Sequence, residues 1–219
     1  NGLTFINGNS TFGGAIANSE GLIGVEEKYE EETSISTYDQ SAPYSDDYTF
    51  MKDRGIMNSA FVDNKASSNQ YAQGGAIYND FGVISTIGNS LFENNVAELK
   101  FQDIAPAALY NMSPYVYGGA ISNTRSIIDT IKDTTFRNNS AVSYKYDSPV
   151  DVYGGAIYND EYSTINNIEN VLFENNTATA VYSYGVSGGA IHNDGNIGNI
   201  TGEFIANSAI NDGYWATGG

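Results

Sequence analysis

The sequence contains no cysteine, so disulfide bridges and thiolate metal sites are excluded. It has only 9 lysine and arginine residues against 26 acidic residues, a net charge of −17. Nucleic acids and anionic membranes bind basic faces, and the few basic residues here form no cluster, so we expect neither as a partner. No run of residues is long and apolar enough to predict a transmembrane helix, so no membrane insertion is expected in this segment.

A motif of two glycines followed by alanine and isoleucine recurs along the chain. Full copies begin at Gly13, Gly74, Gly118, Gly154 and Gly188, and the final Gly218-Gly219 resembles the start of another. A phenylalanine followed three residues later by asparagine alternates strictly with it, at Phe61, Phe92, Phe136, Phe173 and Phe204. Phe5 fits this second motif except that Gly8 replaces the asparagine. Two motifs alternating at such a period predict a solenoid.

The spacing of the two motifs divides each repeat unit into a constant and a variable half. In the last four units the first glycine precedes the phenylalanine by 18, 18, 19 and 16 residues. The distance from the phenylalanine to the next glycine pair varies from 8 to 26 residues. This pattern predicts a rigid scaffold with loops on one side.

Other residue types also recur at equivalent positions. Paired isoleucines precede the phenylalanine at Ile84 and Ile87, Ile128 and Ile131, Ile165 and Ile168, and Ile197 and Ile200. Stacked β-rungs place equivalent residues about 4.8 Å apart, so like side chains pack together and buried asparagines can form a hydrogen-bonded ladder. Short β-forming segments such as 75–79 and 171–174, separated by glycine and asparagine, favour strands over helices.

We therefore predict an all-β fold, a parallel β-helix (solenoid) of about six incomplete coils with loop insertions. One repeat unit is expected to form one coil. Two coils per unit would leave about 15 residues per coil in the tightest units, which is short for three strands and their turns. Residues 1–219 should form a single β-helix domain.

The alternation of Gly-Gly-Ala-Ile with Phe-x-x-Asn resembles the repeat of the polymorphic outer-membrane proteins and of related adhesin-like surface proteins of bacteria and methanogenic archaea. The resemblance covers nearly the whole chain except residues 19–55. It implies a secreted, right-handed parallel β-helix that is displayed at the cell surface, often in adhesion. Gly8 and the long first insertion depart from the pattern, which leaves the geometry of the first coil open.

Residues 19–55 interrupt the repeat with an acidic, tyrosine-rich insertion. Nine acidic residues and four tyrosines lie between Glu26 and Asp53. This composition is typical of a solvated loop, and a binding loop or a flap over a coil end is the alternative.

The variable loops before the glycine pairs are rich in aromatic residues. Equivalent loops of a solenoid stack along one edge, so the rings are predicted to form a stripe parallel to the axis. Aromatic side chains with a polar tip are frequent at recognition surfaces, and packing of the rings against the side of the solenoid is the alternative. The candidate binding residues of this aromatic loop edge are Tyr110, Tyr115, Tyr117, Tyr144, Tyr146, Tyr153, Tyr182, Tyr184, Tyr214 and Trp215.

The position after the isoleucine of each Gly-Gly-Ala-Ile motif holds His192, the only histidine, in the last full unit. Alternation along a strand directs this position toward solvent, so we expect His192 neither to be catalytic nor to bind a metal. Asp80, Asp160 and Asp194 lie two residues further on in three units and are candidates for a column of Ca²⁺ ligands. No calcium-binding loop motif accompanies them, and a turn after the strand also explains aspartate there, so no cofactor is expected.

Three hypotheses for function follow. The first is an extracellular, surface-displayed module that binds a glycan or a protein on another cell through the aromatic loop edge. The second is a structural subunit: the chain starts at Asn1 and ends within a repeat without polar caps, and open coils can stack end to end into a filament. The third is an enzyme acting on carbohydrate, which needs two carboxylates set across a sugar. No residue pattern indicates catalysis, so we expect no enzymatic activity.

Overall fold

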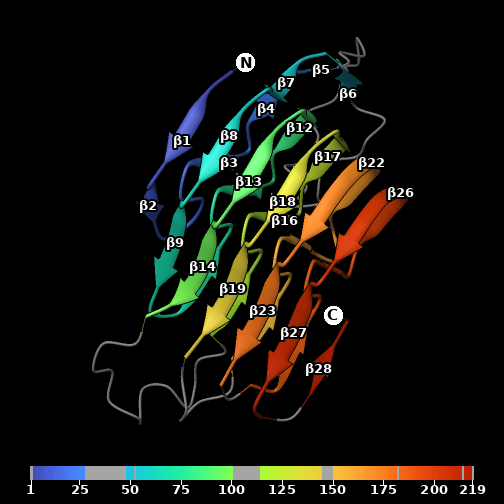
Figure 1. Ribbon diagram of the computed structural model, residues 1–219. Coiled ribbons are helices and arrows are strands. Elements are labelled where there is room, and N and C mark those ends of the chain that lie inside the picture. The colour runs from blue at the N-terminus through green and yellow to red at the C-terminus, as the bar shows by residue number, and fades with distance from the viewer. Residues whose placement is uncertain are drawn as a thin grey trace, which may run out of the picture.

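The computed structural model describes residues 2–27, 48–51, 53–100, 114–144, 150–181, 183–213 and 215–218. In these ranges every regular element is a β-strand and no helix is present, in agreement with the predicted all-β class. Within them there is accordingly no helix long and apolar enough to cross a membrane. Nearly all strand pairs are parallel, and the arrangement is consistent with a parallel β-solenoid (Figure 1).

Ten strands form the widest sheet, here called sheet 1. In the early units, each rung of this sheet consists of two short strands. In the last two units, a single long strand replaces the two. The first half contains β4 (Leu22–Ile23), β7 (Gly55–Met57), β12 (Val83–Gly88) and β17 (Ile127–Lys132). The second half contains β1 (Thr4–Ile6), β8 (Ala60–Val62), β13 (Leu91–Glu93) and β18 (Thr135–Arg137). The strands that span both halves are β22 (Thr164–Glu174) and β26 (Asn196–Ile205).

Three narrower sheets complete the repeat. Sheet 2 contains β2 (Asn9–Ser10), β9 (Lys65–Ser68), β14 (Val96–Leu99), β19 (Ser140–Ser143), β23 (Thr177–Ala180) and β27 (Ser208–Asn211). Sheet 3 contains β10 (Tyr71–Gln73), β15 (Tyr115–Tyr117), β20 (Asp151–Tyr153), β24 (Gly185–Ser187) and β28 (Ala216–Thr217). Sheet 4 contains β3 (Ile16–Ser19), β11 (Ile77–Asp80), β16 (Ile121–Thr124), β21 (Ile157–Asn159) and β25 (Ile191–Asn193).

The chain passes through these sheets in a fixed order, from sheet 1 through sheets 2, 3 and 4 and back to sheet 1. Strands pair in parallel with the equivalent strands of the neighbouring unit. Phe92 pairs with Phe61 on one side and with Phe136 on the other, so the register aligns the repeats as the motifs do. Figure 1 shows the equivalent strands side by side in chain order, from blue to red.

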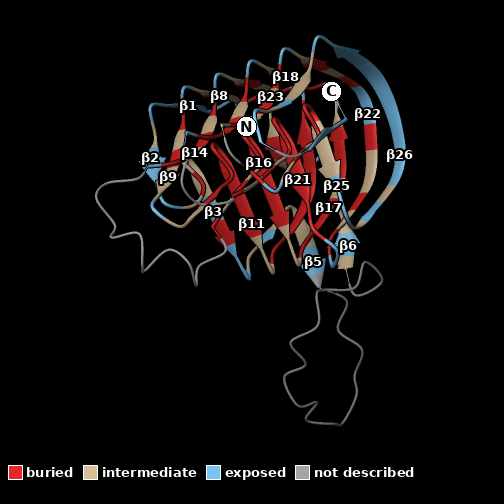
Figure 2. Cartoon of the chain, turned by 90° about the horizontal axis from the view of Figure 1, so that it is seen from below, coloured by how far each residue is buried: buried red, intermediate tan, exposed pale blue. Residues whose placement is uncertain are grey.

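Two hydrophobic cores lie inside the coils, where Figure 2 shows the buried residues in red. The larger core, between sheets 1 and 4, contains the phenylalanine column and the isoleucine pairs. Adjacent rings such as Phe92 and Phe136 are stacked with centroids 4.7 Å apart, and both side chains are fully buried. The smaller core, between sheets 2 and 3, consists mostly of alanine and valine. The predicted stacking of like side chains is confirmed.

The glycine pairs lie where the chain passes from sheet 3 to sheet 4. Gly118 has a φ of 65°, in the left-handed region that side chains disfavour. A Cβ atom on Gly119 would lie 2.0 Å from the carbonyl oxygen of Gly155 and 2.5 Å from the carbonyl carbon of Ser140. The first glycine is therefore required by backbone conformation, and the second by close backbone contact with the next rung and the start of sheet 2.

Two asparagine ladders run along the solenoid. In the predicted ladder, Asn139 Nδ2 donates to Asn176 Oδ1 at 2.9 Å, and its Oδ1 accepts from Asn95 Nδ2 at 2.9 Å. This ladder comprises Asn64, Asn95, Asn139, Asn176 and Asn207. A second ladder, which the sequence interpretation missed, comprises Asn18, Asn79, Asn123, Asn159 and Asn193. The turns are buried, so their polar groups have lost contact with water. In both ladders, hydrogen bonds between asparagine side chains replace that contact.

The acidic insertion leaves the solenoid in the middle of a sheet 1 rung. Ile23 pairs with Ile84, and Ile56 pairs with Ile87, so the chain leaves this rung after Ile23 and rejoins it before Ile56. Its base is an antiparallel hairpin of β5 (Val25–Glu27) and β6 (Tyr48–Phe50). Ile23 and Ile56 are therefore the isoleucine pair of the first unit, separated by the insertion.

Candidate functional site

Five aromatic side chains form what we call the inner aromatic cluster: Tyr115, Tyr117, Tyr153, Tyr158 and His192. They project outward from sheets 3 and 4, on the opposite side of the strands from the cores. The Tyr117 ring lies 4.1 Å from that of Tyr158, and the Tyr153 ring lies 4.3 Å from that of His192. Since outward side chains of two sheets touch, sheets 3 and 4 meet at a corner that is concave on its outer side.

The column after the isoleucine was expected to face solvent, and this is wrong for the three middle units, although Ala17 in the first unit is exposed. Tyr78 and Tyr158 are only 9% and 7% exposed, and Ser122 is fully buried. The outward tyrosines of sheet 3 cover this column across the concave corner. The His192 side chain, 14% exposed, has its Nε2 atom 3.0 Å from Asp194 Oδ2.

Burial perturbs the titration of the inner aromatic cluster. Desolvation raises the pKa of Tyr117 and Tyr158, so both phenols resist deprotonation in alkaline solution more than a solvent-exposed tyrosine does. Burial, with a contribution from the Asp151 charge, raises the pKa of Tyr153 to about 12. Burial also raises the pKa of Asp151, although a hydrogen bond from Tyr153 partly opposes this effect.

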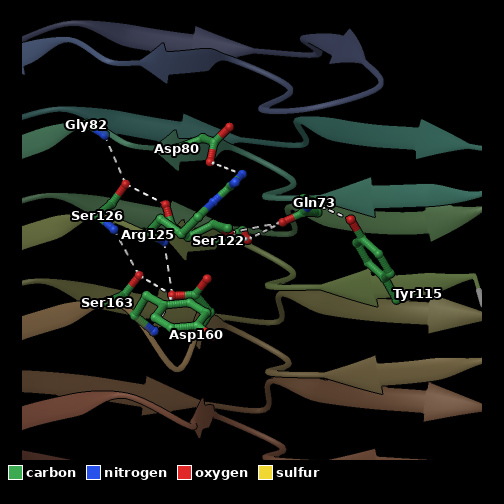
Figure 3. Close-up of polar contacts among 11 residues, drawn as sticks. Gln73, Asp80, Gly82, Tyr115, Ser122, Arg125, Ser126, Asp160 and Ser163 are labelled. Atoms are coloured by element: carbon green, nitrogen blue, oxygen red, sulfur yellow. Dashed lines mark hydrogen bonds and ion pairs between the residues drawn. The ribbon is translucent and has the colours of Figure 1, made fainter. Parts of the chain in front are cut away.

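A polar network borders the cluster in the neighbouring rungs (Figure 3). Gln73, which is buried, donates from Nε2 to the Tyr115 hydroxyl at 3.2 Å and accepts from Ser122 Oγ at 2.9 Å. Arg125 forms an ion pair with Asp80 at 2.8 Å, and its guanidinium lies 4.0 Å from the centroid of the Phe81 ring. The hydrogen bond from Gln73 holds the Tyr115 hydroxyl in place.

The three candidate Ca²⁺ ligands do not converge. Asp80 pairs with Arg125, whereas Asp160 accepts hydrogen bonds from the backbone N–H groups of Arg125 and Tyr162. Asp194 contacts His192. Within the part of the chain that the structure describes, no group of three or more His, Cys, Asp or Glu residues could hold a metal ion. Asp194 and Asp160 instead make contacts close in sequence, and Asp80 and Asp160 also bind Arg125 of the neighbouring turn.

Three aromatic residues form an outer aromatic edge: Tyr144, Tyr184 and Trp215. All three lie in connections from sheet 2 to sheet 3, and their exposed fractions are 64%, 62% and 71%. Four other residues of the predicted aromatic loop edge lie outside the described residues: Tyr110, Tyr146, Tyr182 and Tyr214. The structure thus separates the candidates, because Tyr115, Tyr117 and Tyr153 are on strands and packed, whereas the outer aromatic edge faces solvent.

Tyr158 and His192 were not among the predicted binding residues, although the sequence held a signal for them. The position after each isoleucine alternates to the outer face, as do the tyrosines of sheet 3. Recognising that both outer faces carry aromatic residues would have indicated a contact between them.

The stacked motifs and parallel rungs define a β-solenoid class of repeat protein. Residues 133–160 and 170–194 match the family model of the Chlamydia polymorphic membrane protein (Chlamydia_PMP) repeat. Each stretch contains one Phe-x-x-Asn and one Gly-Gly-Ala-Ile motif, which confirms the resemblance over well under half of the chain. A repeat of this kind implies a surface or outer-membrane protein. No curated protein and no solved structure gave a significant match.

Proposed function

We propose that the chain is a right-handed parallel β-helix in which each repeat unit makes one coil, about six incomplete coils in all. The support is the register, since strands of one unit pair with their equivalents in the next over all four sheets. Right-handedness is implied by the matched family of repeats. One coil per unit turns each sequence column into a continuous stripe on the molecule.

On this scaffold, the protein acts as an extracellular, surface-displayed recognition module in adhesion. The observation that supports this most directly is the outer aromatic edge, where Tyr144, Tyr184 and Trp215 are each more than 60% exposed. Large aromatic side chains bury extensive area at low entropic cost and dominate many binding sites. The matched repeat, which implies a surface protein, agrees with this role. The partner class is a glycan or a protein on another cell.

The test is a variant with Tyr144→Ala, Tyr184→Ala and Trp215→Ala, assayed for binding to whole cells and to a glycan array. Loss of the three rings should weaken binding about tenfold or more, because exposed aromatic anchors carry a large share of binding energy. The two assays separate a glycan partner from a protein partner.

Tyr162→Ala is the matched control, since Tyr162 is 62% exposed in the turn between sheets 4 and 1, away from the outer aromatic edge. It should leave binding unchanged. Equal binding by the triple variant and the wild-type chain would remove the outer aromatic edge from the proposal.

End-to-end assembly is the second candidate function. Apolar side chains are exposed on both outermost rungs, among them Ile6 at 58% and Phe204 at 49%. One feature opposes a continuous junction: Gly8 occupies the asparagine-ladder position and offers no side-chain acceptor to Asn207 of a second copy. Analytical ultracentrifugation at rising protein concentration tests end-to-end assembly. A chain that stays monomeric at high concentration would contradict it.

The proposal includes no catalytic activity. Asp151 and Asp194, two carboxylates beside the inner aromatic cluster, are engaged with Tyr153 and His192 respectively. A glycosidase instead needs two carboxylates free to act across a sugar. A carbohydrate-active enzyme therefore stays the third hypothesis.

A further inference from the structure

A column of turn residues follows the first half of sheet 1, on a different face from the aromatic residues. It consists of Asn58, Asn89, Asp133 and Asn170, which all have positive φ values between 46° and 52°. Their side chains are hydrogen-bonded in two pairs. Asn89 Nδ2 donates to Asn58 Oδ1 at 2.7 Å, and Asn170 Nδ2 donates to Asp133 Oδ1 at 2.8 Å.

This ladder is interrupted between Asn89 and Asp133, which occupy adjacent rungs. Asn89 uses its amide nitrogen toward the preceding rung, so a continued ladder needs a donor from the following rung, where Asp133 stands, to reach Asn89 Oδ1. Asp133 accepts from Asn170 through Oδ1 and has a second carboxylate oxygen, Oδ2. A carboxylate has no N–H to donate, so this step of the ladder lacks the hydrogen bond that would join the two side chains.

The uninterrupted ladders show what is missing. In the Asn95–Asn139 step an amide N–H fills the same place. At the interruption, none of the described residues donates a hydrogen bond to Asp133 Oδ2 or forms an ion pair with that carboxylate. The missing donor must come from outside this part of the chain or from solvent.

A shallow groove of about 360 Å³ opens at this interruption. The residues that line it include Asn58, Asn89, Asp133, Ser90, Leu91 and Thr135. Asn89 and Asp133 are both exposed, so a side chain from another molecule can reach them without rearrangement.

We propose that this groove binds a guanidinium or ammonium group, the cationic side chain of a basic protein partner. Such a group can supply N–H donors to Asn89 Oδ1 and Asp133 Oδ2 and a positive charge to Asp133, and charge-assisted hydrogen bonds of this kind are the strong ones. The net charge of −17 attracts basic partners over distance. A Ca²⁺ ion takes 6–8 oxygen ligands, and this site offers a single carboxylate, so the organic cation fits better. This inference is independent of the outer aromatic edge.

The experiment is an NMR titration of the ¹⁵N-labelled chain with N-acetyl-arginine amide at low ionic strength, followed at the Asn89 side-chain NH₂ and the Asp133 amide. Asp133→Asn is the informative variant, because asparagine keeps the shape of the side chain, restores an N–H to the ladder and removes the charge. We expect saturable shifts in the wild-type chain and at least tenfold weaker binding in Asp133→Asn.

Asp129→Asn is the matched control. Asp129 lies four residues earlier, and its carboxylate already accepts from Asn166 Nδ2 at 2.9 Å and Thr130 Oγ1 at 3.1 Å. Binding by this variant should match the wild type. Equal weakening in both variants would show general charge attraction and overturn the site, and so would a titration in which CaCl₂ alone shifts these two signals.

Discussion

Asn139 shows why one residue type recurs at the same place in successive units. Its side-chain amide donates to the Phe92 carbonyl and to Asn176, and its carbonyl accepts from the backbone N–H and side chain of Asn95. All its hydrogen-bonding capacity is thus used inside a buried turn. The Phe-x-x-Asn spacing was enough to predict this ladder, because each asparagine needs an identical neighbour above and below.

The inner aromatic cluster was less accessible to sequence reasoning. Tyr117 and Tyr158 belong to different units and different sheets, yet their rings stack. Their contact depends on the angle between sheets 3 and 4, which no periodicity reports. The sequence indicated only that these positions face outward, and the concave corner turns outward residues into packed ones.

At the scale of one residue, Asp151→Asn should stabilise the protein at neutral pH. Burial raises the pKa of Asp151 above its ordinary value of 3.8, so the folded state disfavours the charged form. The folded state therefore binds the proton more tightly, and the contribution of this group to stability is complete below the unfolded pKa and lost as pH rises through the folded pKa. Urea unfolding at pH 7 and pH 3 measures the free energy of unfolding of Asp151→Asn and of the wild type. The difference between the two proteins should shrink toward zero at the lower pH.

Glu161→Gln serves as the control for that experiment, because it removes the same charge at an exposed position. A gain at pH 7 in both variants would reflect relief of general repulsion in a chain of net charge −17. A gain only in Asp151→Asn assigns the effect to burial, and a loss there would contradict it.

Among the strands, the segment expected at 75–79 overlaps β11, which begins at Ile77, and the segment expected at 171–174 is the end of β22. The start of the acidic insertion was harder to locate from the sequence. Only the pairing of Ile23 with Ile84 and of Ile56 with Ile87 shows that one rung continues across it. The first isoleucine pair was missed because 32 residues lie between Ile23 and Ile56, whereas two residues lie between the paired isoleucines of the other units.

This geometry predicts that deletion of residues 25–54 leaves the solenoid intact. The deletion joins Gly24 to Gly55, so two residues separate Ile23 from Ile56, as two separate Ile84 from Ile87. Because loop-closure entropy changes slowly with length, the free energy of unfolding should stay within about 2 kcal/mol of the wild type. Circular dichroism and urea unfolding measure it.

Deletion of residues 25–53 is the companion variant. It retains Arg54 as one extra residue, which must bulge or shift the strand register and turn side chains to the wrong face. This variant should be clearly less stable than the longer deletion. If the longer deletion failed to fold, or if the two behaved alike, the insertion would not be an excursion from a single rung.

In the whole molecule, each column of equivalent residues forms a continuous strip, either in the core or on the outer surface. The phenylalanine and isoleucine columns point inward, and the aromatic residues form a packed corner and an exposed edge. The repeat could be predicted from the sequence because the same motifs occur in every unit. The binding partner could not, because the exposed residues lie in the connections that vary between units and obey no shared packing constraint.

We propose that one repeat unit makes one coil, and a distance measured along the solenoid axis is the decisive test. Val62, Glu93, Arg137, Glu174 and Ile205 occupy one column, so Val62 and Ile205 are four rungs apart. The chain has no cysteine, so Val62→Cys and Ile205→Cys give a clean pair of spin labels for double electron–electron resonance. One coil per unit predicts a backbone separation of about 19 Å, from a rung spacing of about 4.8 Å. A separation near 38 Å, as about two coils per unit would give, would rule out one coil per unit.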